Sequence, residues 1–302
     1  MNKTSRRERR AELMLFLLAM IWGGSFVAAK FTMESFDVYW VMVLRFFIGA
    51  FALWVLFPGE HKKVDRTTLR GGAEVGILLG IGTAFQMVGL RYTTPANQTF
   101  IIVSYVITVP LLHYAVSGIK PGKNIMLAAV FTIVGVGFLT IGPSFRLNIG
   151  DVLTFVMALL FAVQMIRIDY WMPQVESSII FTMAQLIAAG VISLVLFFIY
   201  GGRMQIAPLT TASVGGLIYM VVLNTAVAFF LQNYAQRYAS PEKSALIISS
   251  ESLFGTFAAY FFAGEEFYAK KIVGCVLILI GQFLAQVLPM IRKMAREKKI
   301  NT

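Results

Sequence analysis

Apolar runs alternate along the chain with short breaks that are polar or contain glycine and proline. Each run is roughly 15 to 22 residues long, close to the length of about 20 residues that a helix needs to cross a bilayer. Because backbone amides find no hydrogen-bond partner in lipid, each run is predicted to be a helix. Ten such runs begin near Leu13, Val38, Val75, Thr99, Ile125, Val152, Ile179, Ser213, Ser244 and Ile272. The pattern predicts an all-α membrane protein with ten transmembrane helices.

The composition supports this interpretation, since 58% of the 302 residues are hydrophobic and only 14% are charged. Such a chain is too apolar for a soluble domain. The net charge of +11 would suggest nucleic-acid binding in a soluble protein, but here the basic residues lie beside apolar runs. We therefore expect a lipid bilayer, and no nucleic acid, as the partner of this surface.

Lysine and arginine in the connections predict the orientation. With the N-terminus inside, 19 basic residues lie on the cytoplasmic side and six on the outer side. Connections rich in Lys and Arg stay in the cytoplasm. We therefore expect both termini there, with a basic N-terminal segment at 1–12 and a basic tail at 292–302.

A short motif occurs twice, at a distance of nearly half the chain. Arg91–Pro95 reads RYTTP and Arg237–Pro241 reads RYASP, 146 positions later. The same offset pairs Gln86 with Gln232, Tyr92 with Tyr238, Ser104 with Ser250, Tyr105 with Glu251, and Gly135 with Gly281. The earlier spans align more weakly, at an offset near 140. The chain is thus predicted to contain two five-helix repeats, 13–144 and 145–291.

An odd number of spans per repeat forces the second copy to cross the membrane in the opposite direction. Inverted repeats of this kind place a solute site near the midplane and open it alternately to each side. Transport is therefore the favoured function. A non-transporting membrane scaffold and an intramembrane enzyme remain the alternatives.

Three short motifs follow one another in a specific order. WGGSF lies near the end of the first span, RYxxP precedes the fourth and ninth spans, and FFAGEEF covers Phe261–Phe267. In these motifs and their spacing the whole chain resembles the EamA-type branch of the drug/metabolite transporter superfamily. One departure is that the first repeat has Gly-Ile-Lys-Pro at 118–121 where the second has Gly-Glu-Glu-Phe at 264–267.

The resemblance implies a multi-pass protein of the bacterial inner membrane that carries small organic solutes outward, often amino acids or related metabolites. It also implies a cavity lined by spans one, three, four, six, eight and nine. Polar side chains are costly inside lipid, so those in the spans are expected to face this cavity or other helices. The candidate solute-binding residues are Trp22, Ser25, Thr83, Gln86, Asn97, Ser104, Tyr105, Thr108, Gln164, Tyr219, Asn224, Thr225, Gln232, Ser250 and Glu251.

Two charged residues lie well inside apolar runs, each roughly 10 Å from the start of its span at 1.5 Å per residue. Glu251 is a candidate for proton coupling, because a buried carboxyl group could be protonated in one state and ionised in another. A packing role for Glu251 is equally open. Arg45 has a long side chain, and we expect it to extend to the outer interface or to cap a carbonyl.

Glycines and one proline carry structural predictions. Gly72, Gly76 and Gly80 recur every four residues, and Gly135, Gly274 and Gly281 lie on spans five and ten. Both sets of glycines suit close helix packing. For spans five and ten, packing between two protomers of a homodimer is an open alternative. Pro110 should kink the fourth span and is a candidate hinge beside the cavity.

No signature of enzyme chemistry is present. The chain has two histidines and one cysteine, and none has the spacing of a metal site. GIKPGK from Gly118 lacks the spacing and the Ser or Thr of a nucleotide-binding loop, and His113 has no partners for a catalytic triad. We expect no catalytic residues, no cofactor and no metal.

Overall fold

The computed structural model describes residues 3–90, 92–93, 95–141, 148–263 and 269–287, and every regular element among them is a helix. The predicted all-α class is confirmed for this part of the chain. Four sequence predictions fall outside the described residues: the side chain of Asn97, Arg91, the acidic pair Glu265 and Glu266, and the tail at 292–302.

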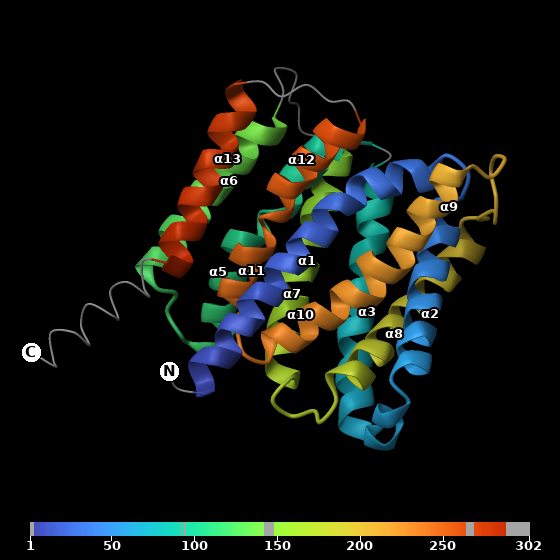
Figure 1. Cartoon of the computed structure of the whole chain (residues 1–302), viewed down its shortest axis with the longest axis horizontal. Coiled ribbons are helices and arrows are strands. Elements are labelled where there is room, and N and C mark those ends of the chain that lie inside the picture. The colour runs from blue at the N-terminus through green and yellow to red at the C-terminus, as the bar shows by residue number, and fades with distance from the viewer. Residues whose placement is uncertain (1–2, 91, 94, 142–147, 264–268, 288–302) are drawn as a thin grey trace, which may run out of the picture.

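The helices follow one another with short connections (Figure 1). A 3₁₀ turn, Pro58–Lys63, links α2 to α3, and a π-helical segment, Tyr219–Val227, joins α9 to α10. A second π-helical segment, Phe283–Val287, continues α13. The α-helices are α1 Lys3–Met33, α2 Val38–Leu56, α3 Arg66–Leu90, α4 Pro95–Ile102, α5 Tyr105–Ser117, α6 Lys123–Thr140, α7 Ile149–Trp171, α8 Ser178–Ile199, α9 Thr211–Ile218, α10 Ala228–Gln236, α11 Pro241–Ile248, α12 Glu251–Ala263 and α13 Ala269–Gln282.

Eight helical stretches in the described residues are long and apolar enough to cross a membrane. Lys123–Phe138 is apolar but shorter. The protein is thus a multi-pass membrane protein by helix length and composition. The count of ten spans stays a prediction.

Polar residues at the short connections begin several helices. The side chain of Asp37 accepts hydrogen bonds from the backbone of Tyr39 and Trp40 at the start of α2. Asn148 and Asp151 form a reciprocal capping box at the start of α7. These side chains satisfy amide groups that have no partner within the helix.

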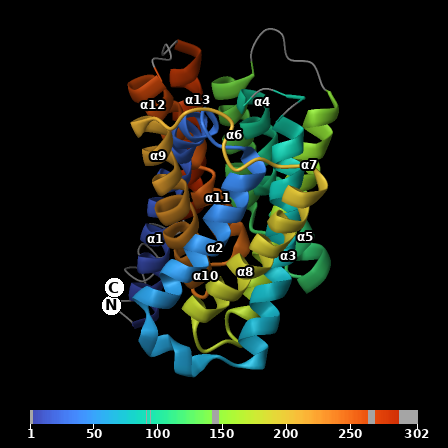
Figure 2. The same ribbon diagram turned by 90° about the vertical axis from the view of Figure 1, so that its right-hand side faces the viewer.

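Glycines let α3 pack directly on α8 along one edge of the molecule (Figures 1 and 2). A Cβ atom added at Gly72 would lie 2.5 Å from the carbonyl oxygen of Phe181, and one at Gly76 would lie 2.2 Å from that of Gln185. The close packing predicted for these glycines is confirmed, and it occurs within one chain.

The helices α6 and α13 form a pair at the other edge (Figure 1). A Cβ added at Gly135 would lie 2.8 Å from the carbonyl oxygen of Gly274, and one at Gly281 would lie 2.9 Å from that of Ala128. The close packing expected of these glycines therefore also occurs within the chain. A homodimer stays a prediction.

Two helical rods, α4–α5 and α11–α12, are each interrupted, at positions that align in the repeat. The first is broken between α4 and α5 at Val103 and Ser104, and the second between α11 and α12 at Ser249 and Ser250. At both breaks the i to i+4 hydrogen bonds give way to i to i+3 bonds, from Ser104 N to Ile101 O at 3.0 Å and from Ser250 N to Ile247 O at 3.1 Å. The breaks lie close together in the molecular interior, since Val103 and Ser249 are fully buried and Tyr105 hydrogen-bonds Glu251.

Pro110 lies inside α5, which is continuous from Tyr105 to Ser117. The interruption of this rod precedes Pro110 by more than one helical turn. The role of Pro110 as a hinge stays a prediction.

Apolar side chains divide into a core and an outer surface. Tyr105, Phe46 and Phe181 are among the largest fully buried side chains. Phe198 and Phe262 are 72% and 73% exposed. Exposed rings of this size on long apolar helices are expected where the surrounding medium is hydrocarbon.

Candidate functional site

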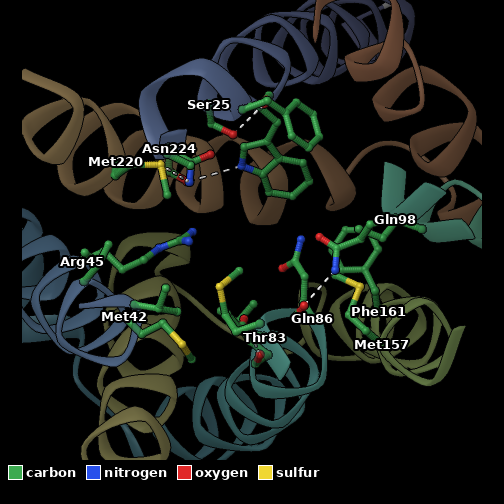
Figure 3. A pocket seen from close by; sticks show the side chains of 18 of the residues that line it. Ser25, Met42, Arg45, Thr83, Gln86, Gln98, Met157, Phe161, Met220 and Asn224 are labelled. Carbon is green, nitrogen blue, oxygen red and sulfur yellow. Dashed lines mark hydrogen bonds between the residues drawn. The ribbon is translucent and has the colours of Figure 1, made fainter. Parts of the chain in front are cut away.

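A cavity of about 170 Å³ lies between α1, α2, α3, α4, α7 and the π-helical segment (Figure 3). Its walls are mostly apolar and include the flexible side chains of Met42, Met87, Met157 and Met220. Methionine adapts to ligands of different shape because it is unbranched and polarisable. A concave apolar site with a few polar groups is the usual form of a small-molecule site.

The cavity lies toward one end of the molecule. Met33, the last residue of α1, and Val38, the first of α2, both line it. The α3 residues in the lining, from Leu79 to Met87, come from the second half of that helix. The cavity therefore reaches the face at which α1 ends and α2 begins.

The structure brings seven of the predicted solute-binding residues together in this lining. They are Trp22, Ser25, Thr83, Gln86, Tyr105, Asn224 and Glu251. Figure 3 shows the side chains of Gln86 and Gln98 on one side of the cavity and Arg45 on the other. The site thus combines neutral polar groups with charged ones from both halves of the chain.

Seven other predicted residues do not line the cavity: Ser104, Thr108, Gln164, Tyr219, Thr225, Gln232 and Ser250. The hydroxyl groups of several of them donate hydrogen bonds to backbone carbonyls instead. The Thr108 hydroxyl donates to the Ser104 carbonyl at 3.3 Å, and the Tyr219 hydroxyl donates to the Ile21 carbonyl at 2.9 Å. A role of these residues in solute binding stays a prediction, because neighbouring helices decide which face of a helix lines the cavity.

Trp22 is fixed in the wall by contacts on two sides. Its Nε1 donates to the carbonyl oxygen of Asn224 at 3.3 Å. Its ring packs against Phe161 and Phe229, with centroids 5.8 Å and 5.6 Å away. The hydroxyl of Ser25 donates to the carbonyl of Trp22 at 2.6 Å. The WGGSF motif therefore joins α1 to the π-helical segment at the cavity.

Arg45 belongs to the lining, which contradicts its predicted extension to the interface. Its Nε donates to the hydroxyl of Thr225 at 2.9 Å. Thr225 in turn donates to the carbonyl of Met220, five residues earlier, at 2.8 Å. The π-helical segment thus orients a cationic side chain at the cavity, and such segments are frequent at functional sites.

Glu251 and Tyr105 meet at the centre of the two broken rods. The Tyr105 hydroxyl donates to Oε1 of Glu251 at 3.4 Å. Glu251 is 8% exposed and begins α12, while Tyr105 is fully buried and begins α5. The N-terminus of a half-helix favours a negative charge, so α12 can stabilise the ionised carboxylate.

Gln98 is a lining residue that the sequence prediction missed in favour of its neighbour Asn97. Its Nε2 donates to the carbonyl of Gln86 at 2.8 Å, as Figure 3 shows. The polarity of the start of α4 was visible in the sequence.

The opposite end of the molecule carries polar contacts, two of which join the halves and one of which lies within the second half. His113 on α5 contacts Glu242 on α11, and Lys243 pairs with Glu12 on α1. A terminal nitrogen of Arg237 donates to the carbonyl of Val175 at 2.6 Å. None of the residues in these contacts lines the cavity.

Polar groups are buried without partners between the cavity and this end. Both side-chain atoms of Gln232, Nε2 of Gln164, and the hydroxyls of Ser244 and Ser250 have no hydrogen-bond partner among the described residues. Most buried polar groups in proteins are paired, because an unpaired group loses its hydration without compensation. This region therefore holds several buried polar side chains whose hydrogen-bonding capacity is not used by the described residues.

Comparisons with known proteins place these features in a family. The model of the EamA-like transporter family matches residues 9–141 and again residues 148–286. A protein of Archaeoglobus fulgidus named an uncharacterized transporter is 28% identical over 276 residues, 90% of this chain and 84% of its own length. A second protein of the same organism and name is 25% identical over 284 residues, 91% of this chain and 96% of its own.

The fold also has a solved counterpart. A crystal structure of a protein superposes with a TM-score of 0.79 at 13% identity, over 92% of this chain and 96% of the other. A likeness at this identity concerns the fold alone.

Proposed function

The chain belongs to the EamA-like transporter family, a branch of the drug/metabolite transporter superfamily, and we propose that it exports amino acids or related small metabolites by alternating access. Two relatives are named uncharacterized transporters, which supports transport without indicating a solute. The proposed setting is the bacterial inner membrane, with both termini in the cytoplasm. Ten spans in two inverted repeats complete the proposal.

One observation carries alternating access. Gln86 and Gln98 line the cavity, whereas their counterparts at the 146-residue offset, Gln232 and Ser244, are buried without partners in the opposite half. Equivalent polar groups thus line the cavity in one half and are buried without hydrogen-bond partners among the described residues in the other. In the opposite state, the half that holds Gln232 and Ser244 would open and hydrate these side chains. The half that holds Gln86 and Gln98 would close and bury them.

Two sets of contacts support the inverted arrangement. Tyr105 hydrogen-bonds Glu251, its own counterpart at the 146-residue offset, and residues that touch their counterparts lie on the axis relating two halves. The α6–α13 pair supports the same axis. Gly135 faces the carbonyl of Gly274 while Gly281 faces that of Ala128, a reciprocal pattern typical of two-fold interfaces.

The predicted orientation indicates which state of the proposed transport cycle this conformation represents. The cavity reaches the face at which α1 ends, and a cytoplasmic N-terminus places that face outside. The structure then corresponds to an outward-facing state whose cytoplasmic end is closed by His113, Glu242 and their neighbours. The driving force in this proposal is either the proton gradient acting through Glu251 or the gradient of the solute alone.

Purified protein in proteoliposomes tests transport directly. Vesicles preloaded with a broad panel of amino acids, neutral sugars, nucleosides and cationic amines should release at least one of them faster than protein-free vesicles. Absence of flux for the whole panel, with correctly folded protein, would contradict the proposal.

Single cysteines test the alternation. In a Cys275→Ala background, Gln86→Cys should react with a membrane-impermeant thiol reagent from outside in the resting protein, and Gln232→Cys should not react from inside. Adding a transported solute should raise labelling of Gln232→Cys from inside. Simultaneous reaction from both sides would indicate a channel instead.

A further inference from the structure

We propose that Arg45 binds a carboxylate group of the transported solute, so that the site selects solutes with this group over their uncharged or cationic analogues. The inference rests on the proposed function, because it assigns a substrate class to the same cavity. It starts from a cationic side chain whose position the sequence did not predict. The residues that carry it are Arg45, Thr225 and Glu251.

Arg45 and Glu251 are the charged residues of the described lining, and they do not neutralise each other. Among the described residues, Arg45 forms no ion pair with an acidic group within 4.0 Å. The nearest polar partner of Glu251 is the Tyr105 hydroxyl, at 3.4 Å. The positive charge therefore faces a mostly apolar cavity without a protein counter-ion among these residues.

An unpaired charge in such surroundings is costly, because it has lost part of its hydration. A solute that brings an anionic group would remove this cost, and charge-assisted hydrogen bonds are stronger than neutral ones. Solute binding and charge compensation would then occur together. Lysine or arginine residues that only stabilise a fold are normally paired within it.

Thr225 orients the guanidinium for this role. Because Nε donates to the Thr225 hydroxyl at 2.9 Å, the two terminal nitrogens are the ones left to face the cavity. Figure 3 shows the end of the Arg45 side chain pointing into the open space, away from α2. Two parallel terminal N–H groups match the two oxygens of a carboxylate.

The chemistry of the lining favours a carboxylate over a phosphate. A phosphate group carries about −1.5 to −2 charges at neutral pH and three strong acceptor oxygens. The described lining offers one cation, Arg45, which leaves the second negative charge of a phosphate without a cationic partner. The apolar and methionine-rich walls suit an apolar side chain on the same solute.

Matched ligands test this inference with the purified wild-type protein. The probes are the twenty standard L-amino acids and the carboxamide of each, which keeps the side chain and the amine but removes the negative charge. We expect at least one amino acid to bind about tenfold or more tightly than its carboxamide, as measured by calorimetry, in line with a charged hydrogen bond of about 1.5–3 kcal/mol.

Variants assign the effect to Arg45. Arg45→Gln should weaken binding of that amino acid about tenfold or more and leave the carboxamide nearly unchanged. Arg203→Gln, which changes an exposed arginine of the outer connection, is the matched control and should behave as wild type. If Arg45→Gln does not fold, Arg45→Lys carries the test: it keeps the charge but not the paired geometry, so weaker binding with a retained preference for the acid supports the inference.

The outcomes separate this inference from transport itself. Equal binding of acids and carboxamides, no binding of either set, or an unchanged preference in Arg45→Gln would overturn the role of Arg45. Flux of any solute of the panel in proteoliposomes would in those cases leave transport by alternating access standing, and flux of an amino acid would also leave the proposed solute class standing.

Discussion

At the scale of single residues, the centre of the molecule is the contact between Tyr105 and Glu251. Each begins the second half of a broken rod, and each is the other's counterpart in the repeat. The symmetric position is thus occupied by a phenol in one half and a carboxyl group in the other. Glu251 lines the cavity and accepts a hydrogen bond from Tyr105, and its proposed role in proton coupling stays a prediction.

Replacing Glu251 with Gln tests proton coupling. We expect Glu251→Gln to keep solute flux but to lose the response of that flux to an imposed pH gradient, because an amide cannot release a proton. Proteoliposome flux with and without the gradient measures this. Tyr105→Phe is the control, since it removes one hydrogen bond at 3.4 Å and leaves the carboxyl group. A full pH response in Glu251→Gln would assign Glu251 to packing.

At the scale of elements, glycine-lined contacts fix the positions of the helices around the cavity. Gly76 brings the backbone of α3 against that of α8, and Gly80 meets Ile192 farther along the same contact. Because α3 also supplies Thr83 and Gln86 to the lining, a displacement of this helix would move the site. The sequence spacing of these glycines therefore contributes to function through packing.

A methyl group on α3 should show how tight this contact is. Gly76→Ala would place Cβ 2.2 Å from the carbonyl oxygen of Gln185 and 2.7 Å from Cβ of Ala188. We expect a loss of about 1–3 kcal/mol, typical of overpacking, seen as a lower melting temperature in detergent. Gly82→Ala on the same helix is the control, because its Cβ would have its nearest neighbour at 3.7 Å. Equal melting temperatures for the two variants would contradict the packing argument.

The closed end depends on contacts between α5 and α11. Replacing Glu242 with Gln removes the charge that His113 contacts, so the closed end should open more often. We expect labelling of Gln232→Cys from inside, in the Cys275→Ala background, to rise about tenfold, as a charged hydrogen bond of about 1.5 kcal/mol implies. Glu60→Gln, which breaks the pair with Lys63 in a surface turn, should leave labelling unchanged. A result no different from that control would show that other contacts hold the closed end.

At the scale of the whole molecule, the charged residues do not obey the two-fold relation proposed for the backbone. His113 and Glu242 close one end, but their counterparts at the 146-residue offset are Ala259 and Ala96. The counterpart of Arg45 at the weaker offset is Gln185, which accepts a hydrogen bond from Asn233 at 2.6 Å. In the proposed alternating-access cycle, the two ends would therefore differ in the free energy needed to open them.

The inverted arrangement has a direct topology test. Tags inserted at the RYTTP and RYASP connections should be accessible from opposite faces of the membrane, with the first outside and the second inside. Protease or antibody access in sealed, oriented vesicles measures this. Both tags on one face would refute the inverted repeat, while a tag at the N-terminus fixes which face is cytoplasmic.

Helix formation and the membrane setting followed from the sequence because they depend on local properties. Apolar runs of sufficient length must form helices in lipid wherever they lie in the bundle. Pro95 and Pro241 begin α4 and α11, as proline at the first turn of a helix allows. The family was also recognisable, since its short motifs keep their order and spacing along the chain.

Other features did not follow from the sequence because they depend on neighbours in the fold. Arg45 had the same sequence signal as an arginine at the interface, and only the approach of Thr225 from the π-helical segment placed it in the cavity. Gln86 and Gln232 are equivalent in the repeat. Gln86 lines the cavity, whereas the side chain of Gln232 is buried without a hydrogen-bond partner among the described residues. Helical periodicity defines which residues share a face, but the conformational state of the bundle decides which face meets water.

The sequence by itself determined the all-helical class, the membrane setting, the family and the glycine contacts, since each arises from spacing or composition along one segment. The tertiary structure alone decided the site. The cavity exists because helices from both halves cross at an angle set by packing, and that crossing brings Arg45, Trp22 and Glu251 into one lining. A sequence lists these residues, but their distances depend on every helix between them.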